Sequence, residues 1–480
     1  MNYNVIHDYL SQVGAAYASR SQDPFTLASL LVVDAQKHAL LSHALRAPQN
    51  SDLPKKLHTL LRVQKTDRLV PFIDSLFNYL ATQPPTAQLV ARGPAQLPIQ
   101  AYRPAYDAWA AVWTKAFAIF SLPEATWFGA SLRHFGLVLL HLAVKADKYQ
   151  VQTSSTKNPC ITDAASKLSK AAGLAAIDRT PAAGQETKRR EVLWLANLSF
   201  YAYFKLNNLR LCDTVLSSVD SAFALNRQFA PLATSALAGA NADQGESCYS
   251  RADRVTYRYY LGRLRLMQHR IRVAHTHLRW AFDNCIVSSR NKVFILVPLL
   301  VASLILGHYP TPALLQASGL DPQFGPLVER LRLGDGAGML QELNRWREWH
   351  RSRGIYLLLR ERLQTACWRN LIRRTLLVSR KLAGQNSGTV SGSASPMPTN
   401  GAAAAQAGKV EAPPNIYLRE ILPAARLAWR DEELTLADVE CVVCSLIDQG
   451  LIKGYLMHKA GRLVLQRGPS MGFVPVASVR

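Results

Sequence analysis

The 480-residue sequence has few cysteines, few acidic residues and no long apolar run. Its seven cysteines follow no regular spacing, which excludes a disulfide framework and is typical of the cytosol or nucleus. Residues 1–10 (MNYNVIHDYL) lack a basic stretch followed by an apolar one, so we expect no secretory signal. The longest apolar run, Val293–Leu306, is broken by Pro298 and Ser303. Because it is shorter than the roughly 18–20 residues of a membrane span, it predicts a buried helix and no membrane insertion.

Catalytic motifs are missing as well. The sequence has no phosphate-binding glycine loop, no His-Glu-x-x-His and no Gly-x-Ser-x-Gly elbow. Cys441–Cys444 has zinc-like spacing but no second pair nearby, and we interpret its thiols as small core residues of a helix. His275–His277 begins like a zinc isopeptidase motif, whose serine and aspartate are here replaced by Cys285 and Ser288. We therefore expect no enzyme activity, no cofactor and no metal.

Positive charge is the dominant feature of what is present. The chain has 56 Lys plus Arg against 33 Asp plus Glu, a formal net charge of +23. Residues 251–381 contain 23 basic and 8 acidic residues, a net +15, and five basic but no acidic residues follow Asp448. With 49% hydrophobic and 19% charged residues the composition is globular, which excludes a largely disordered chain. The charge favours nucleic acid, an anionic surface or an acidic partner.

Helical periodicity runs through most of the chain. Leu261 and Gly262, followed by Ala274, Leu278 and Ala281, match the small and apolar positions of a tetratricopeptide hairpin. We predict a mainly α fold with a helical-repeat solenoid; an irregular helical bundle is the alternative.

The expected organisation has three parts. Residues 1–185 form an N-terminal helical-repeat region, 186–354 a second helical-repeat part, and 355–480 a connecting helix with a terminal domain. Within the last part, residues 384–412 are rich in Gly, Ser and Ala without periodic apolar positions, which predicts a disordered surface loop.

The C-terminal region predicts a winged helix. A long helix over Ile355–Lys381 precedes helical segments at Ile416–Trp429 and Leu436–Gln449. Two short apolar strands, Leu451–His458 and Arg462–Gln466, then flank a Lys-Ala-Gly turn. Three helices followed by a β-hairpin are the order of a helix-turn-helix with a wing.

Two sets of basic residues are candidates for nucleic-acid binding. On the long helix, Arg362, Arg369, Arg373 and Arg380 fall within about 40° of one another at about 100° per residue, so they form one stripe. A solvated helix face or docking of an acidic partner would explain the stripe equally. In the wing the candidates are Lys453, Lys459, Arg462 and Arg467.

The segment Val439–Gln449 carries no Lys or Arg, so we expect binding that follows the phosphate backbone and selects sequence poorly. The alternative is a wing that only packs against partner subunits.

Eight blocks of the sequence carry a family resemblance: Tyr259–Gly262, Ala281–Cys285, Lys292–Leu299, Leu306–Pro310, Arg353–Leu357, Trp368–Leu371, Val439–Leu446 and Gly450–Leu456. In combination they resemble the PCI-domain family, and within it the branch of the TREX-two mRNA-export subunit. A sister branch is the subunit-twelve homologue of the COP-nine signalosome. The resemblance covers roughly residues 190–470, and the N-terminal 150 residues match only in helical character.

The resemblance implies a non-catalytic scaffold of a transcription-coupled mRNA-export complex. Implied partners are a larger PCI-domain scaffold protein, a small acidic disordered subunit, and RNA or DNA. Implied locations are the nucleus, including the envelope or pore through partners, and to some extent the cytoplasm. The alternative is a protein-only scaffold of a signalosome-like or proteasome-lid-like assembly. The chain departs from the branch in its long insert and its arginine-rich solenoid.

Overall fold

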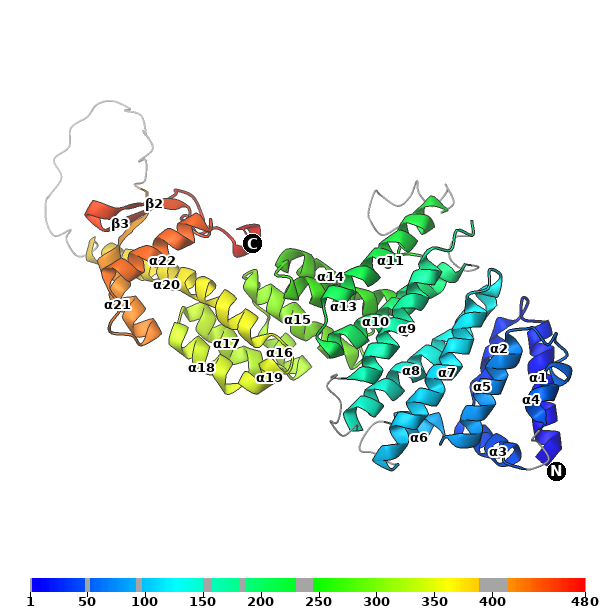
Figure 1. Ribbon diagram of the computed structural model, residues 1–480. Helices are drawn as coiled ribbons and strands as arrows, with labels where there is room; N and C mark the ends of the chain where they lie inside the picture. Colours follow the sequence, from blue (N-terminus) through cyan, green and yellow to red (C-terminus); the bar gives the residue numbers. More distant parts are fainter. Residues whose placement is uncertain are drawn as a thin grey trace, which may run out of the picture. The chain divides into compact units, whose positions relative to one another are not determined.

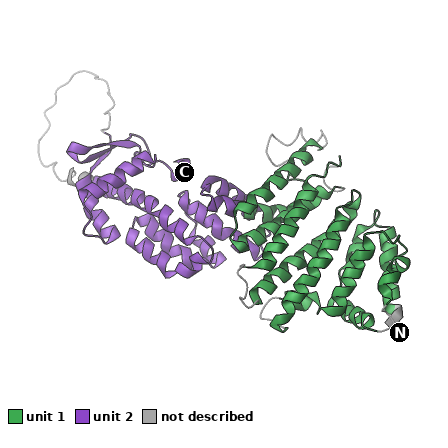
Figure 2. Ribbon diagram, viewed as in Figure 1, with its two compact units in different colours: residues 1–260 green, residues 261–480 purple. Residues whose placement is uncertain are grey.

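The computed structural model describes residues 2–47, 52–91, 97–149, 158–181, 187–229, 245–387 and 413–479. The chain divides into two compact units, Met1–Tyr260 and Leu261–Arg480 (Figure 2). The predicted mainly α fold with a C-terminal winged helix is confirmed. The predicted boundaries at 185/186 and 354/355 fall inside the two units and stay predictions.

The first unit is a succession of helices that pack on their neighbours in sequence (Figure 1). Its core is aromatic where α5, α7 and α8 meet: Phe72 lies edge-on to Phe135 with ring centroids 5.3 Å apart, and Trp109 stacks on Phe135 at 5.4 Å. The elements are α1 (Asn2–Ala18), α2 (Pro24–Leu31), α3 (Ala35–Leu45), α4 (Leu53–Leu60), α5 (Leu69–Thr82), α6 (Thr86–Val90), η2 (Ile99–Ala101), α7 (Tyr102–Phe120), η3 (Ala125–Phe128), α8 (Gly129–Tyr149), α9 (Pro159–Ala176), η4 (Lys188–Glu191), α10 (Val192–Leu206), α11 (Arg210–Gln228) and the start of α13 (Arg251–Met267).

One stretch of this unit, Ala125–Tyr149, is long and apolar enough by length and composition to cross a membrane, with a mean hydropathy of 1.3. In an 18-residue apolar segment of this stretch 61% of the residues are buried, because α8 packs between α7 and α9. That burial is the environment of a core helix.

The second unit begins with helical pairs and ends with the winged helix. Its elements after α13 are α14 (Ile271–Asn284), α15 (Asn291–Ile305), α16 (Pro312–Ser318), α17 (Asp321–Leu333), α18 (Gly336–Arg345), α19 (Arg347–Arg351), α20 (Tyr356–Ser387), β1 (Asn415–Tyr417), α21 (Leu418–Trp429), α22 (Leu436–Asp448), β2 (Gly454–Met457), η5 (His458–Ala460), β3 (Arg462–Leu465) and α23 (Val476–Val479). The predicted buried helix at Val293–Leu306 is confirmed as α15, which is buried from Ile295 onward.

Close approach of α13 and α14 confirms the predicted role of Gly262. A Cβ at this position would lie 2.5 Å from Cγ of Leu278, well inside van der Waals contact. Ala274, Leu278 and Ala281 are fully buried on the facing helix. Small residues therefore set the spacing of this helical pair.

The winged helix is built on a three-stranded antiparallel sheet of order β1-β3-β2. Figure 1 labels β2 and β3 of this sheet. Tyr417 in β1 pairs with Arg462 in β3, and Met457 in β2 pairs with the same residue from the other side. The helices cover one face of this sheet, and Trp368 of α20 stacks on Trp429 of α21 with ring centroids 5.1 Å apart.

Two sequence predictions in this region need correction. The helix predicted at Ile416–Trp429 begins at Leu418, because residues 415–417 form β1 and the Ile416 side chain is buried in the winged-helix core. Long-range pairing with β3 overrides the local helical pattern. The loop predicted at 384–412 starts later, since α20 continues to Ser387. Residues 388–412 lie outside the described residues.

His350 is a buried histidine in α19, with no exposed surface and with both ring nitrogens unpaired among the described residues. It lies edge-on to Phe324 and Trp349, with ring centroids 5.8 and 5.1 Å away. Burial, and next the nearby Arg353 cation, lower its pKa to about 4. The neutral ring is thus the form compatible with this core.

Substitution of Gly262 by alanine should destabilise the protein by about 1–2 kcal/mol, because the new methyl group must displace Leu278 and its neighbours. The matched control is Gly173→Ala in α9, where a Cβ meets nothing within 4 Å and the gain in helix propensity should stabilise by up to about 1 kcal/mol. Chemical denaturation of both variants measures the difference. Equal effects would show that α13 and α14 are not closely packed.

Stability should fall between pH 6.5 and 4 in a manner that depends on His350. The lowered pKa means that the unfolded chain binds a proton in this window that the folded chain does not, so acidification favours unfolding. The variant His350→Leu, which has no group that titrates in this window, should lose less of its melting temperature between pH 7.5 and 5 than the wild type. Equal losses of melting temperature in the wild type and the variant would show that His350 is not the cause of the acid destabilisation.

Candidate nucleic-acid interface

The predicted arginine stripe on α20 is not uniformly exposed. Arg369 is only 9% exposed, and its Nη2 donates to the carbonyl oxygen of Val474 at 2.6 Å. Its guanidinium also lies 5.7 Å from the ring centroid of Phe473. Burial, and next the charge of Arg373, lower the pKa of Arg369. Arg369 therefore ties the chain after the wing to α20, which corrects its predicted role as a phosphate contact.

Further along α20, Arg380 lies close to the loop that follows β3. Its Nη1 contacts Sδ of Met471 at 3.0 Å. The same loop is fixed to the start of β2, since Lys453 donates its N–H to Gly472 at 2.7 Å and accepts from the Gln466 N–H at 2.9 Å. Arg467, which follows Gln466 in the chain, is exposed. The structure thus brings three of the predicted residues, Arg380, Lys453 and Arg467, to one loop, and we call them the basal cluster.

A second group lies at the other end of the β-hairpin. Lys459 is exposed in η5, and Arg462 is half-buried in β3. The guanidinium of Arg462 lies 4.6 Å from the ring centroid of Tyr417, and that of Arg419 lies 4.5 Å from the same ring. We call Arg419, Lys459 and Arg462 the tip cluster.

Sequence reasoning missed Arg419 and Tyr417. Their grouping depends on the pairing of Tyr417 with Arg462, which places β1 beside β3. The available signal was the pair of prolines, Pro413 and Pro414, immediately before Asn415, which marks the start of an extended segment rather than a helix interior.

The other two stripe residues, Arg362 and Arg373, do not belong to the basal cluster. Arg362 is half-buried and lies 18 residues before Arg380, which is about 27 Å along a helix axis. Arg373 is exposed, one turn beyond Arg369. The fold therefore divides the eight predicted residues into a basal group, a tip group, the buried Arg369, the distant Arg362 and the exposed Arg373.

Helix α22 occupies the recognition position of the winged helix. It begins with a capping box in which Thr435 accepts from the Asp438 N–H, and the Asp438 side chain accepts from the N–H of Thr435. Near its middle, Glu440 Oε1 and His458 Nδ1 of η5 are 2.5 Å apart. An acidic side chain thus occupies the face of α22 next to the wing, which agrees with the absence of Lys and Arg from this segment.

The prediction that Cys441 and Cys444 are core residues is wrong, because both are exposed. The buried face of α22 is formed by Val439, Val443 and Leu446. Within the part of the chain that the structure describes, no group of three or more His, Cys, Asp or Glu residues could hold a metal ion.

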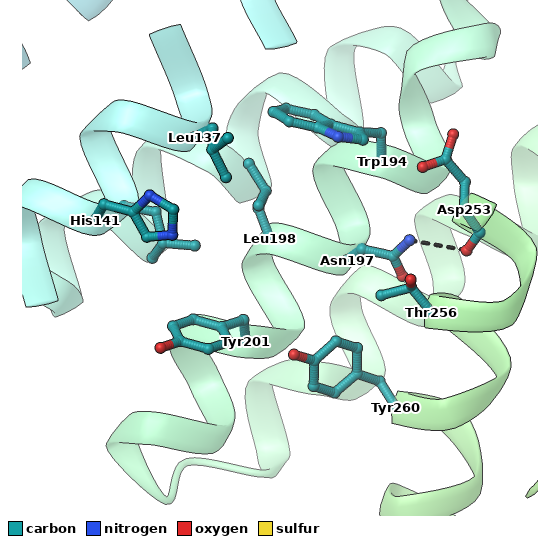
Figure 3. Close-up of a pocket in the computed structure, with 10 residues that line it drawn as sticks. Leu137, His141, Trp194, Asn197, Leu198, Tyr201, Asp253, Thr256 and Tyr260 are labelled. Carbon is teal, nitrogen blue, oxygen red and sulfur yellow. Dashed lines mark hydrogen bonds between the residues drawn. The ribbon is translucent and has the colours of Figure 1, made fainter. Parts of the chain in front are cut away.

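A pocket of about 220 Å³ lies in the first unit between α8, α10 and α13 (Figure 3). It is smaller than the roughly 300–1,000 Å³ usual for small-molecule sites. Its acidic residue, Asp253, is held by Arg133 Nη1 at 3.4 Å and by the Ser250 hydroxyl at 2.8 Å, and its carbonyl oxygen accepts from Asn197 Nδ2 at 2.9 Å. These contacts fix the junction of α10 and α13, so we assign the pocket a structural role.

Replacement of Arg369 by methionine should destabilise the second unit by about 1–3 kcal/mol, because Val474 loses a charge-assisted hydrogen bond in a largely buried position. Arg373→Met, at an exposed position on the same helix, is the matched control and should change stability by less than about 0.5 kcal/mol. Denaturant unfolding monitored by tryptophan fluorescence measures both. If Arg369→Met weakens nucleic-acid binding without loss of stability, the structural assignment is wrong.

Comparison with known proteins places this arrangement in a family. A search against family models finds none that matches. A PCI domain-containing protein of Schizosaccharomyces pombe is 35% identical over 296 residues, which are 61% of this chain and 56% of that protein. Enhanced ethylene response protein 5 of Arabidopsis thaliana is 30% identical over 342 residues, 70% of this chain and 69% of that protein. PCI domain-containing protein 2 of Xenopus laevis is 25% identical over 357 residues, 74% of this chain and 75% of its own length.

The chain therefore spans little more than half of the fission-yeast relative and about seven-tenths or more of the plant and frog relatives. Relatives named PCI domain-containing protein 2 or its homologue also occur in zebrafish and Dictyostelium discoideum. Together with the helical repeats that lead into a winged helix, these similarities show that the chain belongs to the PCI-domain family of scaffold proteins, in the branch of PCI domain-containing protein 2.

Proposed function

We propose that the protein is a non-catalytic scaffold subunit of a nuclear, transcription-coupled mRNA-export complex of the TREX-two kind. In this role it binds a larger PCI-domain protein and a small acidic subunit, and it contacts RNA or DNA through the winged helix. The observation that carries the nucleic-acid part is the placement of basic residues around the β-hairpin. Lys453 and Arg467 lie at its base and Lys459 at its tip, all exposed, in a segment that has no acidic residue after Asp448.

Such a surface suits phosphate contacts rather than base reading. Lysine and arginine side chains on strands and loops can follow a backbone, and each neutralised phosphate releases counterions. The recognition helix α22 offers Glu440, hydrogen-bonded to His458, instead of a basic side chain for the major groove. Binding through the wing would therefore be salt-dependent and weakly selective for sequence.

The exposed apolar side chains of the winged helix support the scaffold part and also favour the second candidate, a protein-only scaffold. Tyr455 and Met457 on the edge strand β2 are 61% and 45% exposed, and Leu427 on α21 is 82% exposed. Large apolar side chains in the open are typical of protein interfaces. In a signalosome-like or proteasome-lid-like assembly these residues would contact partner subunits, and the basic wing would bind an acidic polypeptide.

Charge reversal distinguishes the two candidates. The variant Lys453→Glu/Lys459→Glu/Arg467→Glu should weaken binding of a single-stranded RNA by at least about tenfold and reduce the salt slope of log K by about 2, because three phosphate contacts are lost. All three side chains are exposed, so the fold should be retained. Fluorescence anisotropy at several salt concentrations measures both quantities.

The matched control reverses three exposed arginines away from the wing, with Arg345→Glu/Arg347→Glu/Arg351→Glu on α18 and α19. It changes the net charge by the same amount. If both variants lose the same affinity, binding is nonspecific electrostatics. If only the control loses affinity, the wing is not the nucleic-acid surface.

The export role has its own test, which is affinity purification from nuclease-treated nuclear and cytosolic extracts followed by mass spectrometry. We expect a larger PCI-domain protein and a small acidic protein from the nuclear extract. Recovery of signalosome or proteasome-lid subunits without export factors would replace the export role with the protein-only scaffold.

A further inference from the structure

Ser470 lies three residues after an arginine, in the exposed loop that follows β3. Two arginines of the sequence have a serine or threonine at this spacing, Arg362 before Thr365 and Arg467 before Ser470. Thr365 lies inside α20, where it is half-buried and its hydroxyl donates to the Arg362 carbonyl at 3.4 Å. Residues 466–470 are instead all exposed and outside any helix or strand. Serine kinases with an acidic substrate groove bind an arginine at this spacing through charge-assisted hydrogen bonds, and the loop presents both residues.

The loop is fixed at its ends and can open in its middle. Both ends are held by the two backbone hydrogen bonds to Lys453 described above. Between them, the Met471 N–H donates to the Gly468 carbonyl at 3.0 Å, and the Phe473 N–H donates to the Ser470 carbonyl at 2.9 Å. Among the residues that the structure describes, the Ser470 hydroxyl has no hydrogen-bond partner. The segment can therefore extend into a kinase groove at the cost of turn hydrogen bonds alone, without unwinding a helix.

A phosphate on Ser470 would be surrounded by the basal cluster. Arg380 Nη1 lies 3.0 Å from Sδ of Met471, the residue next to Ser470. Arg467 belongs to the same loop, and no acidic residue follows Asp448 in the sequence. A phosphoserine carries about −1.5 to −2 charges at pH 7 and three strong acceptor oxygens, which arginine side chains bind well. Such a group would offset most of the positive charge of the basal cluster.

We propose that Ser470 is a phosphorylation site for a serine kinase that reads an arginine three residues before its target, and that the phosphate lowers the affinity of the wing for nucleic acid. In the reaction, Ser470 Oγ forms a bond to the γ-phosphorus of ATP. The bond from that phosphorus to the oxygen of the β-phosphate breaks, ADP leaves, and the hydroxyl proton passes to the catalytic aspartate of the kinase.

The modification itself does not depend on the proposed function, whereas its effect rests on the nucleic-acid contact of the wing. The phosphate would act at the base of the β-hairpin. Lys459 and Arg462 of the tip cluster lie at its other end and keep their charges. Phosphorylation should therefore weaken binding without abolishing it.

The modification is tested on the purified full-length chain, incubated with whole-cell extract, magnesium ATP and phosphatase inhibitors, with phosphate located by mass spectrometry. We expect phosphate on Ser470, and about tenfold less of it in Arg467→Gln, because the kinase loses a charge-assisted contact. The matched control is Lys459→Gln, at another exposed basic residue of the wing, which should keep the wild-type occupancy. A lack of phosphate at Ser470, or equal occupancy in the wild type and Arg467→Gln, would overturn the assignment.

The effect is tested with phosphoserine incorporated at position 470 during translation, which gives a uniformly modified protein. It should bind the single-stranded RNA of the charge-reversal test about fivefold more weakly, with a salt slope of log K lower by about 1, because one or two phosphate contacts are lost. The matched control carries phosphoserine at Ser21, an exposed residue of the turn between α1 and α2, and should keep the wild-type affinity. Unchanged affinity with phosphoserine at position 470, or an equal loss in the control, would overturn the regulatory effect.

The two proposals fail separately. If the charge-reversal variant of the wing keeps the wild-type RNA affinity, the nucleic-acid contact is wrong, while occupancy of Ser470 and its dependence on Arg467 are measured without RNA. If the wing binds RNA and phosphoserine at position 470 leaves that binding unchanged, the nucleic-acid contact stands and the regulation is wrong.

Discussion

Helix α20 is the element on which the second unit depends. It packs on α15, α17 and α18 of the helical part and on α21, α22 and β1 of the winged helix. Its buried residues Ile372 and Leu376 belong to the same core as Leu463 and Leu465 of β3. Because one continuous helix serves both parts, the wing and the arginines of α20 have a fixed spatial relation within this unit.

That constraint explains why the basic residues divide as they do. A helix that is packed on two sides has little surface left for solvent, so one arginine of its stripe, Arg369, lies in the interior, where its Nη2 donates to the carbonyl oxygen of Val474. Farther along the same helix, Arg380 reaches the loop beside Lys453 and Arg467. A single periodic stripe is therefore divided between the interior, at Arg369, and the surface, at Arg380.

The surface of this unit carries both basic and exposed apolar side chains. Basic residues gather at the two ends of the β-hairpin, whereas exposed apolar residues occur on β2, on α21 and at the α14–α15 connection. A protein whose work is to hold others needs apolar area for affinity and charge for selection of partners. This distribution suits a member of a family of scaffold proteins.

The sequence by itself determined the helical class and the order of helices and hairpin in the winged helix, because both depend on short-range periodicity. It also determined the close packing at Gly262, because a small residue at this position of a helical pair indicates a close contact. It also determined the excess of positive charge. Tertiary structure decided the rest. Strand β1 exists because β3 lies beside it, so the helix predicted from Ile416 begins instead at Leu418. Arg369 is buried, Cys441 and Cys444 are exposed, and Arg419 joins Arg462 around Tyr417 only when the chain is folded. A helical wheel tells which residues share a face, but what covers that face is set by segments distant in sequence.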